Sequence, residues 1–328
     1  MLNHNQICLG LALGILVTLS ACQSVKPFVS TEQWRPVKTK LLGISGIVSI
    51  ALHAEQPEFL IVHDSKGRKV YTAKITLKER GLEYDALDWH RKDPNEPNDT
   101  GFTKEPFDLE ALTRVPGDES FMALASKGIV YHIRIAPHET VKKVEIIQVL
   151  NEFKLPNPDD EKNLEGFSLQ AFGGDTLAVW AYRGNNKKPG RIYWGLLQPT
   201  KDDVIFQDSA PLVAPWPIGC RQSVDGKCSV RHVSDLRVDP GGLLYVSSAA
   251  ESNDDGPFDS AVYIAGKFER TGNQFALQLR SPLTELFRCK DRKVEAIEIL
   301  GGHPLRLILG SDDENQGGSV LRTERDCG

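Results

Sequence analysis

The sequence lacks the short motifs that identify many enzyme families. It contains no Gly-x-Ser-x-Gly elbow, no His-Glu-x-x-His zinc motif, no Walker loop and no Gly-x-Gly-x-x-Gly fingerprint. Its 8 histidines are scattered and show no metal-ligand spacing. These absences argue against the common serine hydrolases, zinc hydrolases and nucleotide-binding enzymes.

Basic clusters and long apolar runs are also scarce. Lysine and arginine total 39 against 44 acidic residues, which gives a net charge of −5, and no basic cluster stands out. We therefore expect no binding to nucleic acid. The apolar run from Ile7 to Leu19 is too short to span a bilayer and is typical of a targeting segment.

The end of this run predicts a lipid anchor. Leu19-Ser20-Ala21-Cys22 resembles the lipobox of bacterial lipoproteins. We expect a signal peptide at residues 1–21, lipidation of Cys22, a lipidated polar tether at residues 22–33 and a single domain at residues 34–328. An ordinary secretory signal is the alternative. Because Gln23 rather than aspartate follows the cysteine, the expected location is the outer membrane, facing the periplasm, with the acyl anchor as the membrane contact.

The cysteines favour an exported protein. Of 6 cysteines, Cys8 lies in the signal segment and Cys22 is the expected lipidation site, which leaves four. We favour two disulfides, Cys220–Cys228 and Cys289–Cys327, the second joining the C-terminus to the last repeat. A zinc site of four thiols is the alternative, although no Cys-x-x-Cys pair is present.

A strand-rich unit recurs five times along the chain and predicts an all-β fold. Each copy opens with a short strand and continues with an apolar second strand, a third strand and, in most copies, a fourth. The opening positions that we align are Ser45, Glu110, Glu165, Asp235 and Glu295. Four-stranded antiparallel units repeated around an axis are typical of a β-propeller.

The ends of the chain predict how the ring closes. The fifth unit runs out after its third strand, and we expect residues 35–42 to supply the missing outer strand, which removes an open sheet edge. We predict five blades. Six is the alternative, if a degenerate blade lies between Thr200 and Arg231.

In such a ring, the opening of the first strand and the end of the second face the same mouth. The carboxylates predicted there form a candidate metal site, with Arg183 beside it: Glu110, Glu165, Asp235, Glu295, Glu251 and Asp312. Calcium suits an irregular set of oxygen donors. Two structural alternatives stay open. In the first, the opening acids hydrogen-bond backbone amides of the next blade. In the second, the segments after Glu251 and Asp312 are plain turns.

The segments NLEGFSLQ and VSDLRVDPGGLLYVSS resemble those of phytase-like (esterase-like) bacterial β-propellers. They are also similar to an uncharacterised family of propellers whose blades open with Glu-Gly. The resemblance covers roughly residues 41–322. It implies a calcium-rich ring and hydrolysis of phosphomonoesters.

Two functions follow as hypotheses. The first is an envelope lipoprotein whose propeller face binds a small ligand or a protein partner, with calcium as the expected cofactor. The alternative is a calcium-assisted hydrolase of phosphate or carboxylic esters. In that case the catalytic candidates are Asp235, Glu295 and Arg183, with the arginine orienting an anion.

Overall fold

The computed structural model describes residues 33–37, 42–51, 57–64, 70–90, 106–138, 144–198, 200–214, 228–302 and 304–325. The predicted signal peptide and the lipidation site at Cys22 lie outside these residues, as does nearly all of the tether. Within the described ranges, no helix has the length and hydrophobicity needed to cross a membrane.

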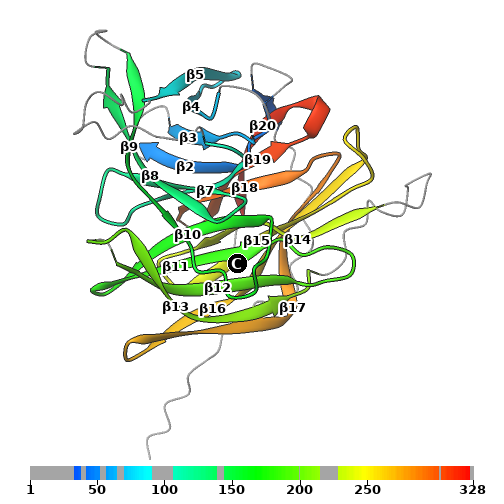
Figure 1. Cartoon of the computed structure of the whole chain (residues 1–328). Coiled ribbons are helices and arrows are strands. Elements are labelled where there is room, and N and C mark those ends of the chain that lie inside the picture. Colours follow the sequence, from blue (N-terminus) through cyan, green and yellow to red (C-terminus); the bar gives the residue numbers. More distant parts are fainter. Residues whose placement is uncertain are drawn as a thin grey trace, which may run out of the picture.

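The described strands form five four-stranded antiparallel units arranged as the blades of a propeller (Figure 1). The outer strands of the first two blades also pair in parallel, Asp88 with Ile146 and Trp89 with Ile147, so these two blades form one eight-stranded sheet. Blade 1 consists of β2 (Gly46–Ala51), β3 (Glu58–Val62), β4 (Thr72–Leu77) and β5 (Leu82–Trp89). Blade 2 consists of β6 (Leu109–Arg114), β7 (Phe121–Ala125), β8 (Ile129–Pro137) and β9 (Glu145–Lys154). Blade 3 consists of β10 (Leu164–Phe172), β11 (Asp175–Tyr182), β12 (Gly190–Gln198) and β13 (Asp203–Leu212).

Blade 4 consists of β14 (Ser229–Val238), β15 (Leu243–Glu251), β16 (Phe258–Thr271) and β17 (Gln274–Lys290). Blade 5 consists of β18 (Val294–Gly301), β19 (Leu305–Asp312) and β20 (Gly318–Arg325), with β1 (Arg35–Pro36) as its outer strand. A single-turn 3-10 helix, η2 (Glu314–Gln316), lies between β19 and β20.

Ring closure and blade number agree with the prediction. Arg35 pairs with Val320 and Pro36 with Ser319, so the N-terminal strand completes the last blade. The innermost strands β2, β6, β10, β14 and β18 each contact the next, and β18 contacts β2. The segment from Thr200 to Arg231 supplies β13 and the start of β14, and its described residues contain no sixth blade.

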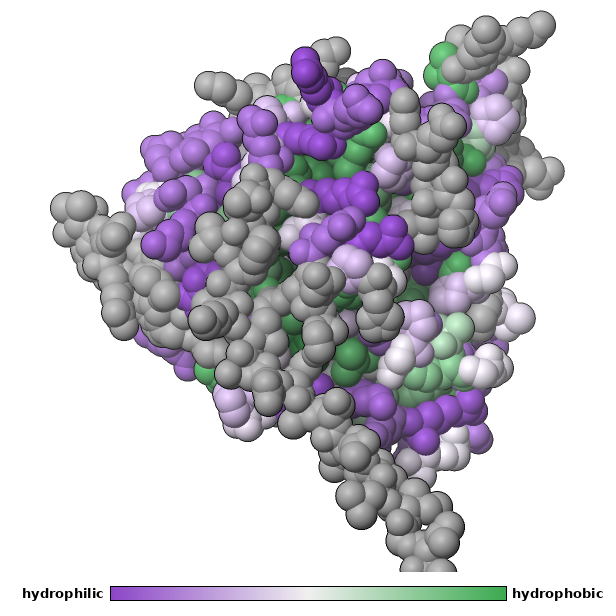
Figure 2. All heavy atoms as spheres, turned by 180° about the vertical axis from the view of Figure 1, so that it is seen from behind, coloured by the Kyte–Doolittle hydropathy of each residue, from purple (hydrophilic) through white to green (hydrophobic). Residues whose placement is uncertain are grey.

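The hydrophobic core consists of layers between neighbouring blades. In β11, Val179 packs toward blade 4, whereas Trp180 packs toward blade 2 and stacks on Tyr193. Successive side chains of a strand point to opposite faces of its sheet, so a blade covered on both sides is apolar throughout. This explains the unbroken apolar second strands. From behind, hydrophilic residues cover much of the described surface, with apolar side chains visible between them (Figure 2).

Five blades meet at Arg237, a buried residue of β14. Its guanidinium donates hydrogen bonds to the carbonyl oxygens of Ile47 (2.7 Å), Leu112 (2.6 Å) and Phe167 (3.0 Å), which belong to blades 1, 2 and 3. Its Nε lies 3.5 Å from Glu298 of blade 5. The arginine thus crosses the axis of the ring and ties the inner strands together.

The prediction for Cys289 is not met. Cys289 carries a free, buried thiol in β17, where its side chain packs in the layer between blades 4 and 5 instead of bonding to Cys327. Burial raises the pKa of this thiol to about 12. Cys327 lies outside the described residues. So does Cys220, and its predicted bond to Cys228 stays a prediction.

Candidate functional site

The mouth of the ring is formed by the first residues of the inner strands. In blades 2, 3 and 5 the pairing of the inner strand shifts at or next to the predicted acid, because a β-bulge interrupts the ladder there. Bulges of this kind re-aim a side chain. The corresponding position in each blade is occupied by Ser45, Glu110, Glu165, Ser234 and Glu295.

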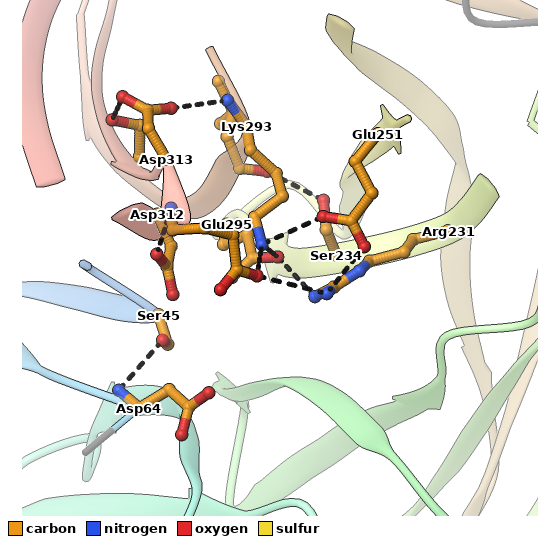
Figure 3. Close-up of polar contacts among 12 residues, drawn as sticks. Ser45, Asp64, Arg231, Ser234, Glu251, Lys293, Glu295, Asp312 and Asp313 are labelled. Carbon is orange, nitrogen blue, oxygen red and sulfur yellow. Dashed lines mark hydrogen bonds and ion pairs between the residues drawn. The ribbon is translucent and has the colours of Figure 1, made fainter. Parts of the chain in front are cut away.

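One half of the mouth is an ion-paired cluster centred on Arg231 of β14. Its guanidinium contacts Glu295 and lies 3.3 Å from Glu251 and 3.6 Å from Glu165. Lys293, whose side chain is 1% exposed, lies 3.2 Å from Glu251 and 3.4 Å from Glu295. Figure 3 shows both glutamates pointing toward these two cations.

Burial and charge act in opposite directions on these glutamates. Burial raises the pKa of Glu295 to about 8, although Arg231 and Lys293 act to lower it. For Glu251 burial also acts to raise the pKa, but the same two cations outweigh it and the pKa is lowered. A carboxyl with a pKa near neutrality is typical of functional sites, and structural ion-pair networks produce one too.

The other half of the mouth brings three acids together. Carboxylate oxygens of Asp64, Asp108 and Glu110 lie within 4.8 Å of one another. Ser126 donates a hydrogen bond to Asp108, and Ser45 Oγ accepts one from the backbone N–H of Asp64. We call these three residues the acid trio.

Glu110 distinguishes the acid trio from the ion-paired cluster. Its side chain is only 9% exposed, yet it forms no hydrogen bond and no ion pair with any described residue. Burial raises its pKa well above the ordinary value, and the charges of Glu165, Glu295, Asp64 and Asp108 add to this effect. Because a buried carboxylate without a partner is unfavourable, this geometry fits a bound cation.

Asp235 does not lie with the other predicted ligands. Its Oδ2 accepts a hydrogen bond from the backbone N–H of Ile297 (2.7 Å), and its Oδ1 lies 3.4 Å from Arg237. The strand alternates sides at every residue, so the alignment on Asp235 is wrong by one position, and Ser234 occupies the place of the acid. Asp235 is therefore a brace between blades 4 and 5, as the structural alternative describes.

Other residues brace the remaining blades. Thr113 Oγ1 accepts from the N–H of Leu169 (3.1 Å), and Ser168 Oγ accepts from that of Val238 (3.0 Å). Glu298 accepts from the N–H of Ser49 (2.9 Å). Thr113, Ser168 and Glu298 each follow the opening acid of their blade by three residues. The opening acids themselves are thus left available to the mouth.

The remaining predicted residues lie at the rim. Arg183 follows β11 and lies 3.2 Å from Glu165. Asp312, at the end of β19, accepts a hydrogen bond from the N–H of Glu314 (3.0 Å), which begins η2. A Cβ at Gly43 would lie 2.0 Å from the Asp312 carboxyl carbon, so a larger residue there would displace the Asp312 side chain.

The segments after Glu251 and Asp312 form turns. Asn253 Oδ1 accepts from the N–H of Asp255 (2.8 Å), which closes the first turn, and the second contains η2. The two turns also bond to each other, since Asn315 donates to Asp255 Oδ1 (3.0 Å).

Sequence reasoning missed Arg231, Lys293 and Asp108. Arg231 lies three residues before the opening position Ser234, and Lys293 lies two residues before Glu295. A basic residue just before the opening position of a blade is the available signal. Asp108 immediately precedes Leu109, but no other blade has an acid there. Of the carboxylates predicted to hold metal, Glu110 alone belongs to the acid trio, whereas Glu165, Glu251 and Glu295 lie beside Arg231.

Comparison with known proteins adds little to this geometry. No protein-family model matches the sequence, and no curated protein matches it either. Among solved structures, the chain is similar to an endo-arabinase from Bacteroides thetaiotaomicron (11% identity, 89% of this chain and 97% of that one, TM-score 0.48). It is also similar to an α-L-arabinanase variant from Cellvibrio cellulosa (9% identity, 87% of this chain and 92% of that one, TM-score 0.46). A third similar structure is an exo-1,5-α-L-arabinanase from a bovine ruminal metagenomic library, with 7% identity over 90% of this chain and 95% of that one and a TM-score of 0.44.

Similarities of this size carry no argument about function. The assignment of the propeller follows from the strand pairing described above. The resemblance to phytase-like and Glu-Gly-repeat propellers stays a prediction.

Proposed function

We propose that this protein is a lipid-anchored envelope protein whose propeller mouth binds an oxygen-rich anionic ligand through a calcium ion. The ion would be held by Asp64, Asp108 and Glu110. The observation that carries the proposal is the Glu110 carboxylate, which is buried beside two further carboxylates and forms no hydrogen bond or ion pair with a described residue. Calcium accepts irregular sets of oxygen ligands and leaves positions for ligand oxygens.

Arg183 supplies the second contact. Its side chain is 31% exposed and pairs with Glu165 alone among the described residues, so part of the guanidinium is open to solvent. Arg231 and Lys293, in contrast, both pair with the buried Glu295. A carboxylate or phosphate of the ligand would bind the cation and Arg183 together.

Calcium binding is tested by calorimetry and thermal melting of the full chain with calcium chloride, magnesium chloride or EDTA. We expect calcium at 100 times its Kd to stabilise the protein by about 2.7 kcal/mol. Glu110→Gln, which keeps the shape but removes the charge, should abolish this effect. Glu119→Gln, an exposed glutamate of the same blade, is the matched control and should retain it. Equal calcium stabilisation of both variants contradicts the site.

A calcium-assisted hydrolase is the second candidate. It is favoured by Glu295, a buried carboxyl held between Arg231 and Lys293 at the same mouth, with a pKa of about 8. Such a group can donate a proton near neutral pH, while calcium would polarise the ester. Asp235 has no part in this candidate, because it binds Arg237 and Ile297.

p-Nitrophenyl phosphate separates the two functions. Binding to the calcium-loaded protein without release of nitrophenolate supports the binding function. Calcium-dependent release that Glu295→Gln abolishes supports the hydrolase. If p-nitrophenyl phosphate neither binds nor reacts, both candidate functions are contradicted for a phosphate ligand.

A further inference from the structure

A second cavity opens at the other end of the inner strands. It has a volume of 680 Å³, which is the size of a small-molecule site. It begins at the residues that follow Arg237 and Glu298 along their strands and extends between blades 4 and 5. Arg237 and Glu298 contribute to its lining, so the central arginine separates this cavity from the acid trio.

The walls of this cavity are mostly apolar. They come from inner strands of several blades and from β15 to β19, and include Leu169, Val238, Tyr245, Leu286 and Ile299. Leu300 and Leu305, which also line the cavity, remain partly exposed although they belong to strands. An apolar wall that stays open to solvent favours an apolar ligand body.

The acidic groups that line the cavity already have partners within the protein. The Asp239 carboxylate accepts hydrogen bonds from the N–H of Leu243 (2.9 Å) and from the hydroxyl of Tyr245 (3.1 Å). Glu298 is paired with Arg237. Both acids are therefore satisfied within the protein.

Two exposed arginines of the lining hydrogen-bond to neutral groups of the described residues. Arg114 donates to the carbonyl of Asp118 (3.3 Å), and Arg280 donates to the hydroxyl of Thr284 (3.2 Å). Neither forms an ion pair with a described residue. Each guanidinium has further N–H groups, and a guanidinium binds a carboxylate, sulfonate or phosphate in a bidentate manner.

We infer that this cavity binds a small amphiphile with an apolar body and one anionic group. The body would lie against the leucine and isoleucine walls between blades 4 and 5, and the anion would contact Arg280 and Arg114. This site is independent of calcium and of the proposed function at the mouth.

Two fluorescent probes that differ by one charge test the inference. 1-Anilinonaphthalene-8-sulfonate is anionic, whereas N-phenyl-1-naphthylamine has the same aromatic body without the sulfonate. Both are titrated into the full chain carrying Cys22→Ser, which removes the acyl anchor and the need for detergent, in the presence of EDTA. We expect both to bind, with the anionic probe the tighter.

Variants locate the two parts of the site. Arg280→Gln should weaken the anionic probe by about tenfold, the loss expected for one charge-assisted contact, and leave the neutral probe unchanged. Arg134→Gln, an exposed arginine of blade 2, is the control and should change neither. Leu300→Trp should fill the cavity and weaken both probes at least tenfold.

Two results overturn the inference. One is wild-type affinity for both probes in a Leu300→Trp variant whose melting temperature and calcium binding show that it is folded. The other is equal loss of both probes in Arg280→Gln, which removes the preference for an anion. Because the probes are measured in EDTA, failure of calcium binding at the mouth leaves this test unaffected.

Discussion

The two halves of the mouth carry the same repeated glutamate in opposite electrostatic settings. In blades 3 and 5, Glu165 and Glu295 share the buried guanidinium of Arg231. In blade 2, Glu110 occupies the equivalent position with no described cation beside it, and Asp64 and Asp108 face it instead. The repeat therefore fixes where a carboxylate lies, and the residues around it decide whether that carboxylate braces the ring or is available to a ligand.

The largest effect should come from removing the shared cation. Arg231→Met keeps much of the side-chain volume but leaves Glu165, Glu251 and Glu295 without their common partner. Breaking a buried ion pair from one side costs about 3–5 kcal/mol, so we expect a loss of that size in urea unfolding at pH 7. If Arg231→Met unfolds at the wild-type urea concentration, the ion-paired cluster does not stabilise the ring.

The architecture could be predicted from the sequence because it depends on hydrophobic periodicity. Apolar second strands such as Leu177–Tyr182 must be covered on both faces, and their fivefold recurrence leaves few folds. The last repeat lacks a fourth strand, and this predicted that residues 35–42 close the ring. Residues 35–36 of that segment form the closing strand. The number of blades and their order could therefore be predicted without knowing any side-chain contact.

The site could be predicted only where it repeats. Glu110, Glu165 and Glu295 were found because they share a position. Asp235 was misplaced because serine and aspartate are adjacent in blade 4, and a shift of one residue moves a side chain to the other side of the strand. Arg231 and Lys293 occur once each, and their contacts join residues far apart in the chain, so periodicity does not reveal them.

The second effect is the pH dependence of stability that Asp235 contributes as a brace, away from the acids of the mouth. Burial raises its pKa from 3.8 to about 7, although Arg237 acts to lower it. Between these values the folded state binds the proton and the unfolded state does not, so this group makes the protein less stable as pH rises through the window. The slope is at most about 1.4 kcal/mol per pH unit.

Asp235→Asn removes this titration. Urea unfolding at pH 5, 6, 7 and 8 should show a flatter decline of stability for Asp235→Asn than for the wild type. Asp118→Asn, which changes an exposed aspartate, should follow the wild-type curve. Parallel curves for wild type and Asp235→Asn would show that this carboxyl is ionised throughout.

The third effect breaks the comparison between Glu110 and the ion-paired Glu251 directly. In EDTA at pH 8, Glu110→Gln should stabilise the protein by about 1–2 kcal/mol, because it removes a buried carboxyl whose ionisation is unfavourable. Glu251→Gln should destabilise it by a similar amount, because Arg231 and Lys293, which act to lower the pKa of Glu251, lose its carboxylate. Destabilisation by both substitutions would mean that the two halves of the mouth do not differ.

The smallest effect on stability is expected at Arg183. This side chain is 31% exposed, and its partner Glu165 keeps Arg231 at 3.6 Å when Arg183 is removed. Partly exposed ion pairs contribute about 0–1 kcal/mol, so Arg183→Met should unfold within about 1 kcal/mol of the wild type, in contrast to Arg231→Met. Its affinity for p-nitrophenyl phosphate in calcium should nevertheless fall by roughly tenfold, the loss expected for one charge-assisted contact. A large loss of stability with unchanged phosphate binding would assign Arg183 to the ion-paired cluster instead of the ligand.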